Sequence, residues 1–149
     1  MAAPLALVIE DRANVRHLLD AVLDGQGMRV CSAATVDEGL AAARRACPDI
    51  VLLDLLLPGS PSDAFVRALR QLPGGDTVPV IVISGLDGAS ARDSIPDIQE
   101  FVAKPFDVHH LLALVRRYLA IRRKATAERA GLLGALDLPP DGAPAAPCP

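Results

Sequence analysis

The chain has 149 residues, of which 51% are hydrophobic and 22% are charged, a composition typical of a folded globular protein. Its net charge of -3, with 3% aromatic residues and no tryptophan, argues against direct nucleic-acid binding. No apolar run approaches the ~20 residues that cross a bilayer, and the amino-terminal segment lacks the basic region of a signal peptide. We therefore expect a cytoplasmic protein that does not bind a membrane.

Five short apolar runs predict the strands of a parallel sheet. The first four are continuous rather than alternating, which is typical of strands that are buried on both faces. In chain order, the runs occupy residues 5–9, 28–33, 50–57, 78–84 and the shorter segment 100–104.

Segments with helical spacing lie between these runs. Helices are predicted over residues 12–24, 35–46, 61–72 and 107–120. Thr35 and Glu38 form a capping box at the start of the second helix. Residues 60–63 supply a cap, a first-turn proline and a first-turn acid to the third. Residues 86–99 contain a glycine, a proline and few apolar residues, so we expect the fourth helix to be short or irregular.

The alternation of strands and helices predicts an α/β fold, a doubly wound five-stranded parallel sheet with helices on both faces. We assign residues 1–120 to this domain, 121–138 to a basic helical extension with a small leucine cluster, and 139–149 to a proline- and alanine-rich tail that is not packed. The basic side chains around the extension are interpreted as a solvated helix end rather than a docking site for an acidic partner.

Polar residues occupy the carboxyl ends of four predicted strands, where the functional crevice of an open parallel sheet lies. Glu10 and Asp11 close the first strand, Asp54 lies in the third apolar run, Ser84 ends the fourth and Lys104 ends the fifth. Three carboxylates at one edge repel one another unless a cation is present, and hard oxygen ligands of this kind select Mg²⁺. A carboxylate can also attack phosphorus, while a metal and an ammonium group neutralise the phosphoryl oxygens.

These residues also carry a family resemblance. The acidic pair, the segment LLDLLLPG around Asp54, the segment ISG with Ser84 and the segment AKPF with Lys104 follow one another at spacings of 43, 30 and 20 positions. The pattern resembles the receiver domain of bacterial two-component response regulators, and the single-domain chemotaxis regulators in particular, over about residues 4–120. The resemblance implies a flavodoxin-like fold with strand order 2-1-3-4-5.

The resemblance also implies a role for each residue at the strand ends. Asp54 would accept a phosphoryl group, and Mg²⁺ would be held by Asp11, by Asp54, by Glu10 through a water molecule and by the backbone carbonyl of Leu56. Ser84 and Lys104 would bind the phosphoryl group. The switch residues would be Ser84 and Phe101.

By the same resemblance, the phosphodonor would be a sensor histidine kinase or a histidine phosphotransfer protein. The chain would catalyse only its own phosphorylation and dephosphorylation, so it would not be an enzyme in the usual sense. Because the residues after position 120 are too few for an output domain, we expect a stand-alone receiver that signals by contact with a downstream protein.

Three other interpretations are weighed against this one. A receiver-like adaptor that works without phosphorylation is possible, although the intact acidic pair, acceptor, hydroxyl and lysine argue against it. A phosphohydrolase with an aspartate nucleophile usually has a second aspartate two positions later, where this chain has Leu56. A nucleotide-binding domain is disfavoured because the segment EDRANVR after the first strand has no glycine-rich phosphate loop.

Overall fold

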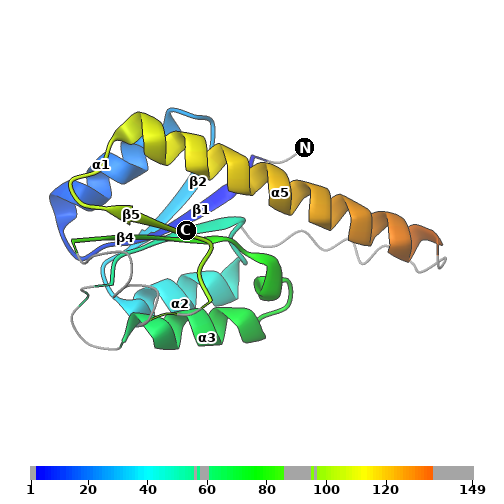
Figure 1. Ribbon diagram of the computed structural model, residues 1–149. Helices are drawn as coiled ribbons and strands as arrows, with labels where there is room; N and C mark the ends of the chain where they lie inside the picture. Colours follow the sequence, from blue (N-terminus) through cyan, green and yellow to red (C-terminus); the bar gives the residue numbers. More distant parts are fainter. Residues whose placement is uncertain (1–2, 56, 58–60, 86–94, 96, 136–149) are drawn as a thin grey trace.

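The computed structural model describes residues 3–55, 57, 61–85, 95 and 97–135, without the side chains of residues 132–135. Five parallel strands form one sheet in the order β2-β1-β3-β4-β5, which confirms the predicted topology (Figure 1). The strands are β1 (Leu5–Ile9), β2 (Arg29–Ala33), β3 (Ile50–Leu53), β4 (Val80–Ser84) and β5 (Glu100–Ala103). The predicted irregular fourth helix and the predicted unpacked tail lie mainly outside the described residues.

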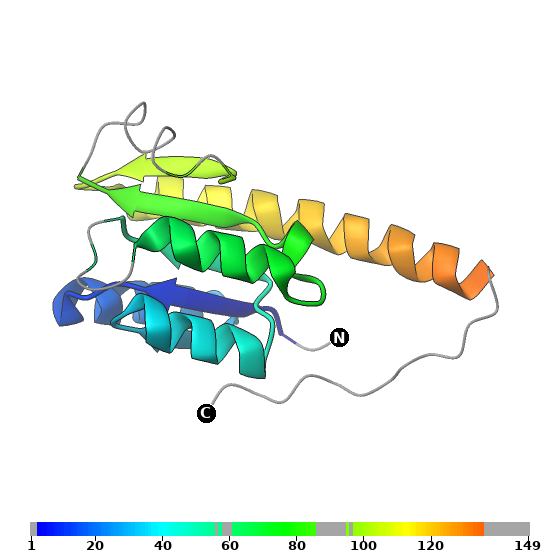
Figure 2. The ribbon, with the colours of Figure 1, turned by 90° about the horizontal axis from the view of Figure 1, so that it is seen from below.

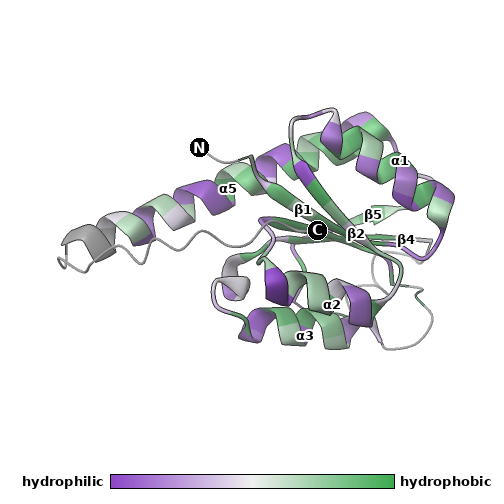
Figure 3. Ribbon diagram, turned by 180° about the vertical axis from the view of Figure 1, so that it is seen from behind, coloured by the Kyte–Doolittle hydropathy of each residue, from purple (hydrophilic) through white to green (hydrophobic). Residues whose placement is uncertain are grey.

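Helices cover both faces of the sheet (Figures 1 and 2). They are α1 (Ala13–Asp24), α2 (Val36–Arg45), α3 (Ser62–Gln71) and α5 (Val108–Ala135), and a 3-10 turn, η1 (Gly75–Thr77), follows α3. One buried cluster lies between the sheet and α1 with α5, and the other lies between the sheet and α2 with α3. Hydrophobic and hydrophilic residues alternate along the helices (Figure 3), and the buried hydrophobic ones belong to the two clusters against the sheet, as expected for amphipathic helices that bury one stripe.

The predicted helix caps are confirmed at α2 and partly wrong at α3. At α2, the Thr35 hydroxyl accepts a hydrogen bond from the Glu38 N–H, and the Glu38 carboxylate accepts one from the Ala34 N–H. At α3, Pro61 stands at the N-cap position, outside the first turn, and makes no side-chain cap. Asp63 does lie in the first turn, as predicted.

Arg70 joins three segments at the amino edge of the sheet. Its guanidinium donates hydrogen bonds to the carbonyls of Gly75 and Val78 at 2.9 and 2.6 Å. It also pairs with the Asp97 carboxylate at 2.9 Å and donates to the Gln99 side chain at 3.3 Å. Since Arg70 is largely buried, with 11% of its side chain exposed, these bonds fix the end of α3 against the residues that precede β4 and β5.

The last helix is longer than the segment predicted with the domain, because α5 continues without a break from Val108 to Ala135. Arg122 donates to the Thr77 hydroxyl at 2.6 Å and pairs with Asp49 at 3.5 Å, and Arg129 pairs with Asp76 at 3.2 Å. The interpretation of this basic segment as solvated is therefore wrong for Arg122, whose side chain is 13% exposed. No described helix, α5 included, has a stretch apolar enough to span a membrane.

Candidate functional site

The sheet's backbone pairing continues one residue beyond the strands and fixes the side chains at its carboxyl edge. The N–H of Glu10 donates to the Ala33 carbonyl and that of Asp54 to the Ile9 carbonyl, both at 3.0 Å. The N–H of Lys104 donates to the Ser84 carbonyl at 2.9 Å. Residues far apart in the sequence are therefore held side by side by the sheet itself.

Lys104 lies between two buried carboxylates. Its ammonium nitrogen is 2.9 Å from Glu10 Oε2 and 3.0 Å from Asp54 Oδ2. Glu10 is 2% exposed and Asp54 is 5% exposed, whereas the Lys104 side chain is 21% exposed and reaches the solvent. Buried carboxylates are tolerated where a cation compensates them, and Lys104 is that cation for both.

Burial and pairing shift two pKa values in this cluster. Burial raises the pKa of Glu10 above its ordinary value, and the hydrogen bond from Lys104 only partly offsets this effect. Burial alone would lower the pKa of Lys104, but the hydrogen bonds and charges of Glu10 and Asp54 outweigh it and raise the pKa. The Lys104 ammonium group therefore stays charged, and its single positive charge is shared between two carboxylates.

Asp11 completes a group of three carboxylates that fits a divalent cation. Glu10, Asp11 and Asp54 each offer an oxygen, and these oxygens lie within 4.8 Å of one another. Asp11 is exposed, while the other two are buried. Arg16 steadies the acidic pair from α1, because its guanidinium donates to the backbone carbonyls of Glu10 and Asp11 at 2.9 and 3.4 Å. A set of hard oxygen donors of this size suits Mg²⁺.

A cavity of about 240 Å³ opens beside this cluster, and its lining includes a residue that sequence reasoning missed. The lining residues are Asp11, Arg12, Asp54, Gly85 and Lys104. Arg12 directly follows the acidic pair in the sequence, and this adjacency is the signal that could have identified it.

Of the predicted site residues that the structure describes, three do not line the cavity: Glu10, Ser84 and Phe101. Ser84 is fully buried at the end of β4, although Gly85, the next residue, reaches the cavity. Phe101 is half-buried and packs against the cluster under α2 and α3. The switch roles of Ser84 and Phe101 stay predictions. Leu56, whose carbonyl is predicted to bind the metal, lies outside the described residues.

Ser62 contacts the site through the backbone of Asp54. Its hydroxyl donates a hydrogen bond of 2.9 Å to the backbone carbonyl of Asp54, and the residue is buried. Since Ser62 is also the first residue of α3, this bond ties the start of that helix to Asp54. The contact is not evident from the sequence, because it joins residues eight positions apart.

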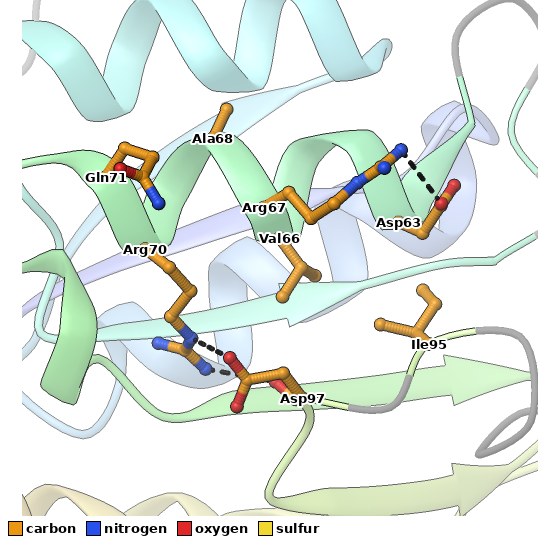
Figure 4. Close-up of a pocket in the computed structure, with 8 residues that line it drawn as sticks. All are labelled: Asp63, Val66, Arg67, Ala68, Arg70, Gln71, Ile95 and Asp97. Atoms are coloured by element: carbon orange, nitrogen blue, oxygen red, sulfur yellow. Dashed lines mark hydrogen bonds and ion pairs between the residues drawn. The ribbon is translucent and has the colours of Figure 1, made fainter.

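A larger cavity, of about 710 Å³, lies between α3 and the residues that precede β5 (Figure 4). Figure 4 shows two charged pairs along its wall, Arg67 with Asp63 and Arg70 with Asp97. Because these charges are paired with each other, we place the chemistry at the smaller cavity, where carboxylates gather around one ammonium group.

Comparisons with known proteins agree with this geometry. Residues 6–116 match the family model described as the response regulator receiver domain. The KDP operon transcriptional regulatory protein KdpE of Escherichia coli is 38% identical over 119 residues, which cover 78% of this chain and 51% of that protein. The chain thus spans about half the length of this curated relative.

Solved structures show the same fold. The receiver domain of the sensor histidine kinase PA1611 from Pseudomonas aeruginosa is 25% identical, with a TM-score of 0.73 over 80% of this chain and 99% of that one. That structure has a magnesium ion coordinated in its active-site cleft. The chemotaxis protein CheY4 of Vibrio cholerae is 24% identical, with a TM-score of 0.74 over 78% of this chain and 99% of that one, and supports the fold alone.

Proposed function

The chain belongs to the response regulator receiver family, and on that premise we propose that it is a phosphorylation switch whose acceptor is Asp54. The observation that carries the proposal is the Lys104 ammonium, 3.0 Å from the Asp54 carboxylate at the wall of an open cavity. An acceptor needs access for a phosphodonor and a cation for the incoming oxygens, and this arrangement supports both.

In the proposed reaction, a carboxylate oxygen of Asp54 attacks the phosphorus of a phosphohistidine. An O–P bond forms, the P–N bond to the donor imidazole breaks, and its electron pair returns to that nitrogen, which takes up a proton. The phosphoryl group is then held on Asp54 as an acyl phosphate, and the imidazole is the leaving group. Lys104 would then exchange its contact with the carboxylate for one with a phosphoryl oxygen, with the Ser84 hydroxyl as a second proposed donor.

Asp11 and Asp54 would bind Mg²⁺ directly, with Glu10 acting through a water molecule and Leu56 through its carbonyl. When bound, the ion supplies charge neutralisation for the phosphoryl oxygens. The three carboxylate oxygens that lie within 4.8 Å of one another support this assignment.

We further propose a cytoplasmic protein that receives its phosphoryl group from a sensor histidine kinase or a histidine phosphotransfer protein. It would act by contact with a downstream protein, without direct nucleic-acid binding, and would catalyse only its own phosphorylation and dephosphorylation. Residues 1–120 would form the receiver, residues 121–138 a basic helical extension and residues 139–149 an unpacked tail.

A phosphorylation-independent adaptor is the competing function, and one experiment separates the two. Purified protein is incubated with Mg²⁺ and acetyl phosphate or phosphoramidate, and the intact mass is measured. We expect one phosphoryl adduct on the wild type and on the control Asp24→Asn, which removes an exposed acid at the end of α1. We expect none on Asp54→Asn, or on the wild type when EDTA replaces Mg²⁺. An unmodified wild type would favour the adaptor and refute the proposal.

A further inference from the structure

We infer that Arg12 is, after Lys104, a second cationic side chain of the phosphoryl site. In that role it is a specificity-determining residue that favours doubly charged phosphodonors. The inference rests on the proposed function of Asp54 and names the kind of donor that this particular site prefers. Arg12 lines the same cavity as Asp54 and Lys104. Its backbone N–H donates to Glu10 Oε1 at 3.2 Å, which holds the residue beside the acidic pair.

The position of Arg12 is unfavourable for α1. It occupies the N-cap, where serine, threonine, aspartate and asparagine are preferred because they accept hydrogen bonds from the first turn. Arg12 makes no side-chain cap, and the first turn of α1 holds no acid to offset its charge. A cation at this end is also repelled by the helix dipole. Residues that are unfavourable for the local helix, as Arg12 is at this N-cap, are expected at functional sites.

The side chain of Arg12 is available to a ligand. The residue is exposed, and within the described part of the chain its guanidinium has no hydrogen bond or ion pair. Arg16, one turn later, differs because its guanidinium is engaged by the carbonyls of Glu10 and Asp11. Of these two neighbouring arginines, one therefore supports the acidic pair and the other faces the cavity.

Charge balance indicates what Arg12 does there. Glu10, Asp11 and Asp54 carry three formal negative charges, and Lys104 balances one of them. Arg16 does not line the cavity, and its guanidinium is bound to the backbone carbonyls of Glu10 and Asp11, so the balance at the cavity is set by the other groups. With Arg12 and a divalent cation added, the site has one excess positive charge before transfer. Conversion of the Asp54 carboxylate into a dianionic acyl phosphate then makes it neutral. Without Arg12 the phosphorylated site would keep one uncompensated negative charge, and a dianionic donor would approach a neutral cavity.

The test compares Arg12→Gln with Arg44→Gln, an exposed arginine near the end of α2 whose loss changes the net charge equally. Phosphorylation rates on Asp54 are measured with acetyl phosphate, a dianion near pH 7.5, and with phosphoramidate, a monoanion, at fixed ionic strength and Mg²⁺. We expect Arg12→Gln to slow the dianionic donor by roughly three- to fivefold and the monoanionic donor by less, since exposed charge contacts are weak. Arg44→Gln should match the wild type.

The Mg²⁺ affinity is a second measurement. The direction in which it changes in Arg12→Gln separates an electrostatic role from structural damage. Removal of a cation beside the carboxylates should tighten Mg²⁺ binding in Arg12→Gln, measured by isothermal titration calorimetry, while phosphorylation by the dianion falls. A damaged site would lose both. Equal slowing of both donors, weaker Mg²⁺ binding or wild-type rates in Arg12→Gln would each overturn the inference and leave the proposed function intact. A wild type that accepts no phosphoryl group would overturn both.

Discussion

The two edges of the sheet use charged side chains in opposite ways. At the amino edge, Arg70, Arg122 and Arg129 each meet a carboxylate or several carbonyls, and their bonds join segments of the fold. At the carboxyl edge, one ammonium group, that of Lys104, stands between two buried carboxylates with a third nearby. The first arrangement satisfies its charges internally, whereas the second leaves negative charge that a metal ion can neutralise. The fold is fastened at one end of the strands, and the proposed phosphoryl site lies at the other.

The largest expected effect is at the amino edge. Arg70→Ala removes hydrogen bonds to two carbonyls and an ion pair from a largely buried side chain. Because buried acceptors left without donors are costly, the free energy of unfolding should fall by about 2–3 kcal/mol in urea denaturation. Asp54 should still be phosphorylated wherever the variant is folded.

Arg67 provides the matched control on the same helix. It pairs with Asp63 one turn away, and its side chain is 76% exposed. Arg67→Ala should change stability by no more than about 0.5 kcal/mol. Similar losses in the two variants would mean that the bonds of Arg70 do not fasten this edge.

A smaller and opposite effect is expected at the carboxyl edge. The folded protein holds the pKa of Glu10 above the ordinary value of 4.5, so folding favours the neutral acid. Its stabilising contribution is present below pH 4.5 and is lost as the pH rises through the folded pKa. Glu10→Gln, which stays neutral, should therefore melt a few degrees above the wild type at pH 7.5 in EDTA, and the difference should shrink toward pH 4.

Magnesium sharpens this prediction. The ion should raise the melting temperature of the wild type more than that of Glu10→Gln, because the variant has lost one of the charges that attract it. Thermal unfolding followed by circular dichroism, with and without Mg²⁺, measures both effects. A variant that melts below the wild type in EDTA at neutral pH would show that the acidic cluster is not a source of instability.

The smallest effect concerns an acid that serves structure alone. Asp107 Oδ1 accepts hydrogen bonds from the N–H groups of His109 and His110 at 2.7 and 3.2 Å, and these bonds lower the pKa of Asp107 below 3.8. Asp107→Ala should lower the melting temperature slightly at neutral pH. The deficit should disappear as the pH falls through the depressed pKa, where the wild type also loses the charge.

Asp107→Asn is the control, since its amide oxygen still caps the helix. It should lie between the wild type and Asp107→Ala in thermal melts. A deficit of Asp107→Ala that persists unchanged at pH 2 would contradict a role for the charged carboxylate.

The sequence predicts the sheet well because its strands are short apolar runs, whose polar ends also identify Glu10, Asp54 and Lys104. It misses contacts that depend on which surfaces meet. Arg70 and Arg122 look like ordinary surface arginines, and only the packing of η1 beside α3 and α5 brings carbonyls and a hydroxyl to them. Pro61 is predicted in the first turn of α3 but lies at its N-cap, because a proline is accepted at both positions. The helix therefore starts one residue later than predicted.

Arg12 and Ser62 illustrate a different limit. Each lies next to a predicted feature, the acidic pair or the start of α3, and neither stands out in the sequence by itself. The hydroxyl of Ser62 reaches the carbonyl of Asp54 eight positions earlier in the chain. The contact of Ser62 is encoded neither by hydrophobic periodicity nor by strand order, whereas Arg12 is marked only by its place directly after the acidic pair.

The uninterrupted α5 has a mechanical consequence. At 28 residues it is a rod of about 42 Å, since each helical residue adds about 1.5 Å. Its first half packs into the core, and its second half extends beyond the sheet. Arg122 and Arg129 lie in this second half and form ion pairs with Asp49 and Asp76. The two ion pairs therefore hold the second half of this long helix against the residues that precede β3 and β4.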